Sequence, residues 1–273
     1  MIPKIIHYVW LGGNPLPKKH SDCIDTWKEL CPDYEIVRWD ENNFDIDGCL
    51  WVKQAMDKKM YAFASDAIRF YALYKQGGIY MDTDTYLVKN PEPLLNEDAI
   101  MGCDRNRLWI NAEFLGSSKG NAFFKFLSDY YYTRPLKEES GKVKQTFSVV
   151  MALTELTNQY YGKFKAGKEP FLLAAEDKPS LKLYTGDYFS PKDYMTGKLR
   201  ITDNTYAVHD HTGSWWSPRN KRGQDFASIM RRVMGRHIFR VFESMVTKGQ
   251  RKIIRKSLKA HPIDNNFNNN NEQ

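Results

Sequence analysis

The chain has 273 residues and a formal net charge of +7, with 42% hydrophobic and 27% charged residues, which are ordinary values for a globular protein. Its length suits one large domain with additions, and its apolar stretches fall short of the roughly 20 residues of a membrane-spanning helix. The first residues lack a signal-peptide pattern, and the four cysteines lack the paired spacing of a metal site. We therefore expect no transmembrane helix, free thiols in a reducing compartment and a cytoplasmic location.

The first part of the chain alternates strand and helix patterns. Residues 4–10 predict a strand, 20–31 a helix and 34–39 a second strand, an order typical of parallel strands joined by a helical crossover. Residues 50–76 read as largely helical, and Gly77 follows them where a helix-ending glycine belongs. The pattern therefore predicts an α/β fold with a parallel sheet.

The later elements are shorter and end in a biased tail. Strands are expected at 99–102 and 112–116, helices at 120–133 and 143–162, short strands and loops at 170–210, and a basic helical pattern at 224–259. The Asn-rich end is low in complexity and is expected to be disordered. We therefore divide the chain into a main domain at 1–222, a basic amphipathic helical segment at 223–260 and a disordered tail at 261–273.

Two carboxylates stand one residue apart where a short apolar run ends. Asp82 and Asp84 follow residues that predict a buried strand bounded by Gly77 and Gly78. An ionised carboxylate is costly to bury, so it is usually paired or bound to a metal. Carboxylate oxygens suit Mg²⁺ or Mn²⁺, and such an ion would hold phosphate oxygens. The Asp82-Thr83-Asp84 triplet therefore predicts a site for a metal ion and a diphosphate.

Other polar groups could join this site. Asp66 and Arg69 are three residues apart on one side of the preceding helix, where they form either a surface ion pair or a pair that faces a polar ligand. Trp10 ends the first strand beside two glycines and either faces a base or lies in the core. His209 and His211 lie in a cluster with a serine and two tryptophans, and imidazole suits Mn²⁺. Because the two histidines alternate, only one of them is expected to face an ion.

The order of these segments resembles glycosyltransferase family 32, whose members carry a DXD sugar-binding region. The matching segments are Val9-Trp10-Leu11-Gly12-Gly13, Ser65-Asp66-x-x-Arg69, Gly77-Gly78-Ile79-Tyr80-x-Asp82-Thr83-Asp84 and His211-x-Gly213-Ser214-Trp215. The site motifs are also similar to those of the glucosyltransferase domain of large clostridial toxins. The resemblance covers residues 3–110 and 205–216. It implies a GT-A fold, a Rossmann-like sheet that binds a nucleotide sugar and a divalent cation.

On the nucleotide side, the resemblance implies that Trp10 stacks on the base and that the Val9 backbone meets the edge of the base. Ser65 would contact the ribose region, and Tyr80 would line the nucleotide pocket. Asn111 is expected near the donor sugar.

On the sugar and metal side, the resemblance implies that Asp66 and Arg69 hold hydroxyls of the donor sugar. Asp84 would bind the cation directly, Asp82 would reach it through water or the ribose, and His211 would replace an acidic ligand of the toxins. The implied cofactor is Mn²⁺ or Mg²⁺.

Around the leaving group, Ser214 would lie near the metal. The indole N–H of Trp216, with Trp215 as the alternative, would donate to the β-phosphate. Negative charge builds on that phosphate as its bond to the sugar breaks, which is where a cation and an N–H donor stabilise the transition state. Because the family is retaining and the sequence offers no obvious covalent nucleophile, we expect a front-face displacement. The implied catalytic residues are Asp66, Arg69, Asp82, Asp84 and Trp216.

The resemblance implies a hexosyltransferase that uses a UDP-sugar or a GDP-sugar, with uridine favoured by the context of Trp10. The acceptor would be a glycan or a lipid-linked saccharide, as in capsule or lipopolysaccharide synthesis. Family members often carry a Thr-Gly-Pro element where this chain has residues 145–148, so the acceptor stays open. Two alternatives remain: a haloacid-dehalogenase-like phosphatase using Asp82, whose pattern Tyr86 breaks, and a non-catalytic sugar-nucleotide-binding module.

The positive charge is concentrated near the C-terminus. Residues 219–260 hold thirteen Lys and Arg residues but only two acidic ones, and apolar residues recur at helical spacing from Phe226 to Met245. A basic amphipathic helix can lie on anionic lipid, or it can cap the domain with a solvated basic face. Both interpretations stay open, and no nucleic-acid partner is expected.

Overall fold

The structure is a computed structural model that describes residues 1–104, 109–132, 134–136, 148–165, 167–193 and 197–211, together with 249, 251, 252 and 255. The predictions for residues 212–248 and for the Asn-rich tail lie outside the described residues. Among the described residues, no helix combines the length and the apolar character needed to cross a bilayer. The four cysteines are buried, and none of them is in a disulfide.

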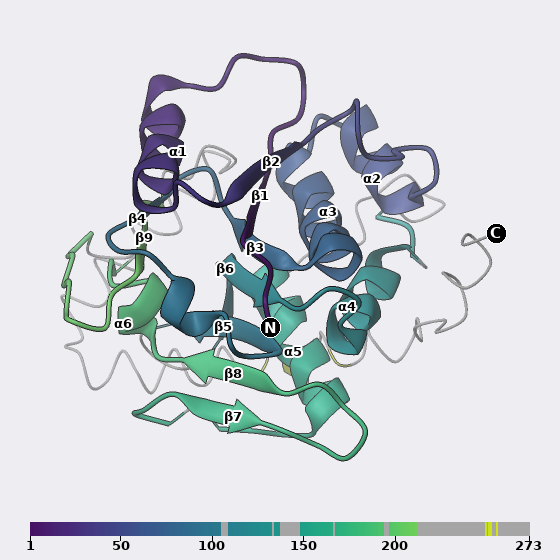
Figure 1. The fold of residues 1–273 in the computed structure, drawn as a ribbon. Helices are drawn as coiled ribbons and strands as arrows, with labels where there is room; N and C mark the ends of the chain where they lie inside the picture. Colours follow the sequence, from purple (N-terminus) through teal and green to yellow (C-terminus); the bar gives the residue numbers. More distant parts are fainter. Residues whose placement is uncertain are drawn as a thin grey trace, which may run out of the picture.

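A seven-stranded sheet runs through the molecule in the order β2-β1-β3-β6-β5-β8-β7 (Figure 1). Its strands are β1 (Ile5–Val9), β2 (Glu35–Trp39), β3 (Gly78–Met81), β5 (Ala99–Cys103), β6 (Ile110–Ser117), β7 (Phe171–Leu173) and β8 (Leu181–Tyr184). β1 pairs in parallel with β2 and β3, as the crossover pattern predicts. β6 runs antiparallel to β3 and β5, so the complete sheet is mixed rather than parallel.

Helices pack on both faces of this sheet. They are α1 (Lys18–Leu30), α2 (Leu50–Asp57), α3 (Tyr61–Gln76), α4 (Ala122–Tyr132), α5 (Val149–Tyr161) and α6 (Gly186–Phe189), with a short 3-10 helix, η1 (Glu92–Leu94). One buried apolar cluster joins the sheet to α2, α3, α4 and α5, and another joins it to α1 and α6. Since side chains alternate along a strand, Tyr80 of β3 belongs to the first cluster, whereas Ile79 and Met81 belong to the second.

Two predicted helices differ from the observed ones. The single helix expected at 50–76 is wrong, because α2 ends at Asp57 and α3 begins at Tyr61. Lys59, between them, has a φ of 54°, which cannot continue a right-handed helix. The helix expected at 143–162 begins at Val149 in the structure, and residues 143–147 lie outside the described part of the chain.

A glycine pair sets the geometry of the turn from α3 into β3. Gly77 and Gly78 have φ angles of 70° and 96°, which side-chain-bearing residues rarely adopt. A Cβ at Gly77 would lie 2.6 Å from the Lys119 backbone nitrogen, and one at Gly78 would lie 2.6 Å from the Ile5 carbonyl oxygen. The glycines therefore let β3 enter the sheet directly beside β1.

A second, two-stranded sheet pairs β4 (Thr85–Leu87) with β9 (Ala207–His209) in antiparallel fashion. Thr85 lies opposite His209 in this register. The pairing brings the chain near residue 209 to the turn that contains Asp82 and Asp84.

Candidate functional site

Asp82, Thr83 and Asp84 form the turn between β3 and β4. The Asp82 backbone N–H donates to the Glu113 carbonyl oxygen at 3.1 Å, and the Thr85 N–H donates back to the Asp82 carbonyl oxygen at 2.9 Å. β3 is buried at every position, so the predicted placement of both carboxylates at the end of a buried strand is confirmed.

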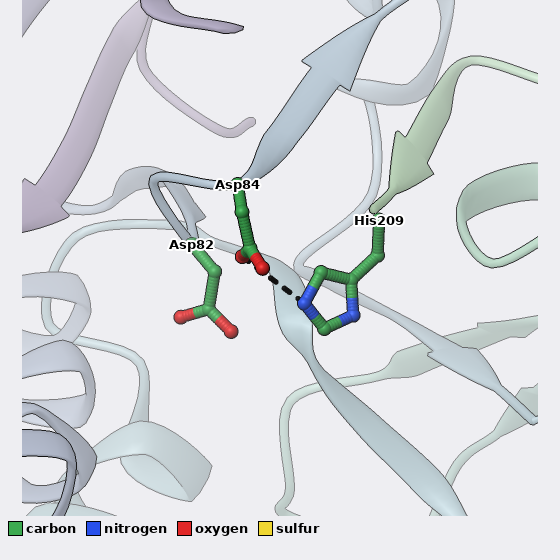
Figure 2. A group of neighbouring side chains, drawn as sticks. All are labelled: Asp82, Asp84 and His209. Carbon is green, nitrogen blue, oxygen red and sulfur yellow. Dashed lines mark hydrogen bonds and ion pairs between the residues drawn. The ribbon is translucent and has the colours of Figure 1, made fainter. Parts of the chain in front are cut away.

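His209 completes a compact cluster with the two aspartates (Figure 2). One ligand atom from each of Asp82, Asp84 and His209 lies within 4.8 Å of the others. His209 Nε2 lies 3.1 Å from Asp84 Oδ1, and the Asp210 N–H donates to the Asp84 carbonyl oxygen at 2.9 Å. The pairing of β4 with β9 thus holds one imidazole against the acidic turn.

The chemistry of these three groups fits a divalent cation. Two carboxylates and an imidazole are ligands that Mn²⁺ accepts, and carboxylates alone suit Mg²⁺. Burial opposes protonation of His209, but its hydrogen bond with Asp84 and the nearby carboxylates raise its pKa to about 9. The raised pKa shows that the carboxylates around His209 favour a positive charge at this position, which a bound cation would supply.

The structure brings His209, rather than the predicted His211, within reach of both aspartates. The His211 ring packs against the His209 ring, with centroids 4.1 Å apart. At His211 φ is 52°, so the extended alternation behind the prediction stops there. Burial, followed by the neighbouring His209, lowers the pKa of His211 to about 3. The metal-ligand role of His211 stays a prediction.

Arg69 connects the helix pair to the acidic turn. Its guanidinium lies 3.1 Å from Asp66 Oδ1 and 3.3 Å from Asp82 Oδ1, and it donates to the Ala112 carbonyl oxygen at 2.8 Å. Asp66 and Arg69 are both buried, so the surface-pair interpretation is wrong for this pair. Burial raises the pKa of Asp66 to about 7, against the opposing effect of Arg69.

Two further predicted residues contact Arg69. The Arg69 guanidinium lies 4.6 Å from the centroid of the Tyr80 ring, and the Tyr80 hydroxyl donates to Asp82 Oδ1 at 2.8 Å. Ser65 Oγ accepts from Arg69 at 3.2 Å. The structure therefore gathers Ser65, Asp66, Tyr80 and Asp82 around the Arg69 guanidinium.

Trp10 reaches the acidic turn through an intermediate histidine. Val9 is buried at the end of β1, whereas Trp10 is half-buried beyond it. The Trp10 ring lies 5.4 Å from the ring of His20, centroid to centroid, and His20 Nδ1 lies 2.7 Å from Thr83 Oγ1. Sequence reasoning missed His20 and Thr83, because only the packing of α1 against the turn joins them.

Asn111 lies beside two buried groups that sequence reasoning also missed. Its side-chain N–H donates to Ser190 Oγ at 2.7 Å, and the Ser190 hydroxyl donates to the Glu113 carboxylate. Burial raises the pKa of Glu113, and the nearby charge of His209 opposes that rise. The spacing of Asn111 and Glu113 on one strand was visible in the sequence, but nothing there pointed to Ser190.

Ser214, Trp215 and Trp216 lie outside the described residues, so their predicted roles stay predictions. Of the predicted residues that are described, those of α3 and β3 contact Arg69 or Asp82, Asn111 lies on β6, and Val9 and Trp10 lie at the end of β1. This is an α/β fold in which Asp82 and Asp84 lie beside the buried Arg69–Asp66 pair, with carboxylates that suit a divalent cation.

A family model described as "Glycosyltransferase sugar-binding region containing DXD motif" matches residues 17–101. The predicted resemblance to glycosyltransferase family 32 is confirmed, and the matched segment contains Asp82 and Asp84. The sheet, with Asp82 and Asp84 directly after β3, bears out the predicted α/β fold class.

The chain is also similar to curated glycosyltransferases. Inositol phosphoceramide mannosyltransferase 3 of Schizosaccharomyces pombe is 31% identical over 50% of this chain and 43% of its own length. Mannosyl phosphorylinositol ceramide synthase SUR1 of Saccharomyces cerevisiae is 29% identical over 45% of this chain and 33% of its own. This chain thus spans less than half the length of these relatives. Among solved structures, the PaToxG glycosyltransferase is similar over 58% of this chain and 69% of its own, at 19% identity and a TM-score of 0.40.

Proposed function

We propose that the chain is a metal-dependent, retaining glycosyltransferase that moves a hexose from a nucleotide sugar to a glycan or lipid-linked acceptor. The observation that carries the proposal is the cluster of Asp82, Asp84 and His209, with its ligand atoms within 4.8 Å of one another. The buried Arg69–Asp66 pair directly beside it supplies the groups that a sugar needs.

In this proposal, Asp84 and His209 hold the cation and Asp82 assists them. When bound, Mn²⁺ or Mg²⁺ would neutralise charge on the departing diphosphate. Asp66 accepts hydrogen bonds from hydroxyls of the donor sugar, and Arg69 fixes the directions of both Asp66 and Asp82. Because Asp82 Oδ1 receives the Tyr80 hydroxyl and faces Arg69, it is better placed to orient a ligand than to attack a phosphate, which favours a transferase over the phosphatase alternative.

The donor is one of a few nucleotide sugars. The names of the mannosyltransferase relatives favour a mannosyl donor and a phosphate-bearing lipid acceptor, whereas the context of Trp10 favours a uridine nucleotide. A lipid-linked acceptor fits our further proposal of a cytoplasmic enzyme that contacts the membrane through its C-terminal basic segment.

A donor screen tests the proposed function. Nucleotide release would be measured with Mn²⁺ from UDP-glucose, UDP-galactose, UDP-N-acetylglucosamine and GDP-mannose. We expect slow release from one donor class, because a transferase leaks to water, and loss of release in Asp84→Ala. Binding without release would support the non-catalytic module instead. Hydrolysis of a simple phosphate ester that Asp82→Asn abolishes would support the phosphatase.

A further inference from the structure

Three polar side chains from two distant segments form a hydrogen-bonded chain beside the site. Asn111 and Glu113 are two residues apart on β6, and Ser190 follows α6. The Asn111 side-chain N–H donates to Ser190 Oγ at 2.7 Å. The Ser190 hydroxyl in turn donates to the Glu113 carboxylate. The series of hydrogen bonds therefore runs from Asn111 through Ser190 to Glu113.

The Glu113 end of this series of hydrogen bonds is buried. Glu113 is 5% exposed and Ser190 is 4% exposed, whereas Asn111 is only partly buried. Leaving a buried carboxylate without a donor is costly, so the Ser190 proton is committed to Glu113. A hydroxyl has one proton, which leaves the Ser190 oxygen free only to accept. The Asn111 carboxamide must therefore turn its nitrogen toward Ser190 and its oxygen away.

The backbone of the same strand segment holds the residues proposed to bind the donor. The Glu113 carbonyl oxygen accepts from the Asp82 N–H at 3.1 Å, and the Ala112 carbonyl oxygen accepts from Arg69 at 2.8 Å. The backbone carbonyls of Ala112 and Glu113 thus fix Arg69 and the acidic turn, respectively. The side chain of Asn111, at the less buried end of the series of hydrogen bonds, lies on the same strand.

We propose that Glu113 is a positioning residue that acts through Ser190 to hold the Asn111 carboxamide in one orientation toward the donor sugar. This inference rests on the proposed transferase function. A fixed carboxamide would place the sugar for reaction without reorganisation, which is the benefit of a preorganised site. Glu113 itself touches neither the sugar nor the cation in this proposal.

A double-mutant cycle tests the inference, with Ser190→Ala, Asn111→Ala and the combined variant in the full-length chain. We would measure kcat and KM for nucleotide release from the accepted donor, and the affinity for UDP or GDP with Mn²⁺. Each single variant should lower kcat roughly tenfold, as expected for one hydrogen bond used in the transition state. The combined variant should be no slower than Asn111→Ala, because both changes disable the same carboxamide.

Nucleotide affinity should stay unchanged, because Asp82, Asp84 and His209 are untouched. Ser190→Thr keeps the hydroxyl and should restore kcat. Ser117→Ala is the matched control, since Ser117 is a buried serine on the same strand whose hydroxyl donates to the Ser118 carbonyl oxygen. If Ser190→Ala unfolds the protein, Glu113→Leu replaces it in the cycle, because a leucine of similar bulk cannot accept the Ser190 proton and so releases the Ser190 hydroxyl from its fixed direction.

The inference is overturned if Ser190→Ala keeps wild-type kcat, or if its effect adds fully to that of Asn111→Ala. An equal loss of kcat in Ser117→Ala would also overturn the inference, since the loss in Ser190→Ala would then reflect the stability of the strand. If the wild-type chain releases nucleotide from no donor, the proposed function fails and this inference falls with it. That outcome differs from the others, in which the wild type is active.

Discussion

His209 Nε2 lies 3.1 Å from Asp84 Oδ1, although 125 residues separate the two in sequence. The contact exists because β9 pairs with β4 immediately after the DXD turn, with Thr85 opposite His209. A small two-stranded sheet therefore brings the imidazole to the carboxylates, while the large sheet positions the carboxylates themselves.

Replacing His209 by alanine should weaken Mn²⁺ binding by roughly tenfold or more, because one of three clustered ligands is lost. The measurement is a calorimetric Mn²⁺ titration in the presence of saturating nucleotide. His211→Ala is the control, since its ring packs on His209 without joining the cluster. A larger loss of affinity in His211→Ala than in His209→Ala would restore the ligand set that the sequence predicts.

Replacing Arg69 by lysine should lower both activity and stability. A lysine has no planar fork with which to contact Asp66, Asp82 and the Ala112 carbonyl oxygen together. The buried carboxylate of Asp66 and the partly buried carboxylate of Asp82 would lose their shared partner, so we expect the free energy of unfolding to fall by on the order of 3 kcal/mol. Urea unfolding measures the loss. Arg38→Lys, at a half-exposed pair with Asp40, should change it by less than about 1 kcal/mol. Equal losses in the two variants would show that Arg69 contributes no more than a surface arginine.

The sequence predicted the local part of this site and missed the part made by long-range packing. The apolar run and the glycines placed Asp82 and Asp84 at a strand end, and helical spacing put Asp66 on the side of Arg69, since both signals lie within a few residues. The choice between His209 and His211 depended on a strand pairing across the chain. The contacts of Ser190 with β6, and of His20 with Thr83, likewise depend on how distant segments pack.

His7 should make the stability of the fold pH-dependent. Its side chain is buried, its Nδ1 accepts from Trp39 at 3.1 Å and its Nε2 lies 2.7 Å from the Gly77 carbonyl oxygen. Burial lowers the pKa of His7 from 6.5 to about 4. Between pH 6.5 and pH 4, the unfolded chain therefore takes up a proton on His7 more readily than the folded chain does. The stabilisation is therefore complete above pH 6.5, falls as the pH drops from 6.5 to 4, and changes little below that.

From this group alone, the expected loss is about 3 kcal/mol, since each pKa unit corresponds to about 1.36 kcal/mol. The measurement is urea unfolding from pH 8 to pH 4 for the wild type and His7→Gln. Glutamine can also donate and accept, but it does not titrate. The difference between the two curves isolates His7 from groups such as Asp66, whose raised pKa acts in the opposite direction. Parallel curves would mean that His7 keeps its ordinary pKa in the fold.

Two arginines of the C-terminal segment, Arg251 and Arg255, contact Glu155 of α5 in the main domain. Arg255 Nε lies 2.6 Å from Glu155 Oε2, Arg251 Nε lies 3.5 Å from Oε1, and the Arg251 guanidinium lies 5.0 Å from the centroid of the Trp109 ring. The Glu155 side chain is only 2% exposed. Part of the positive charge near the C-terminus therefore neutralises a buried carboxylate of the domain itself.

Replacing Arg255 by alanine should lower the free energy of unfolding by about 1–2 kcal/mol, less than for a fully buried pair because Arg255 is partly exposed. Thermal and urea unfolding measure the change. Lys252→Ala, at an exposed position of the same segment, should have almost no effect. Adding Glu155→Gln to Arg255→Ala should recover part of the loss, since the buried side chain at position 155 then carries no charge that has lost one of its two arginine partners. A truncation before residue 249 would remove both arginines, so loss of membrane binding by such a truncation would mix anchoring with destabilisation. Substitution of exposed lysines of the segment is the cleaner test of membrane contact. If Arg255→Ala and Lys252→Ala unfold at the same urea concentration as the wild type, the segment is not part of the folded domain.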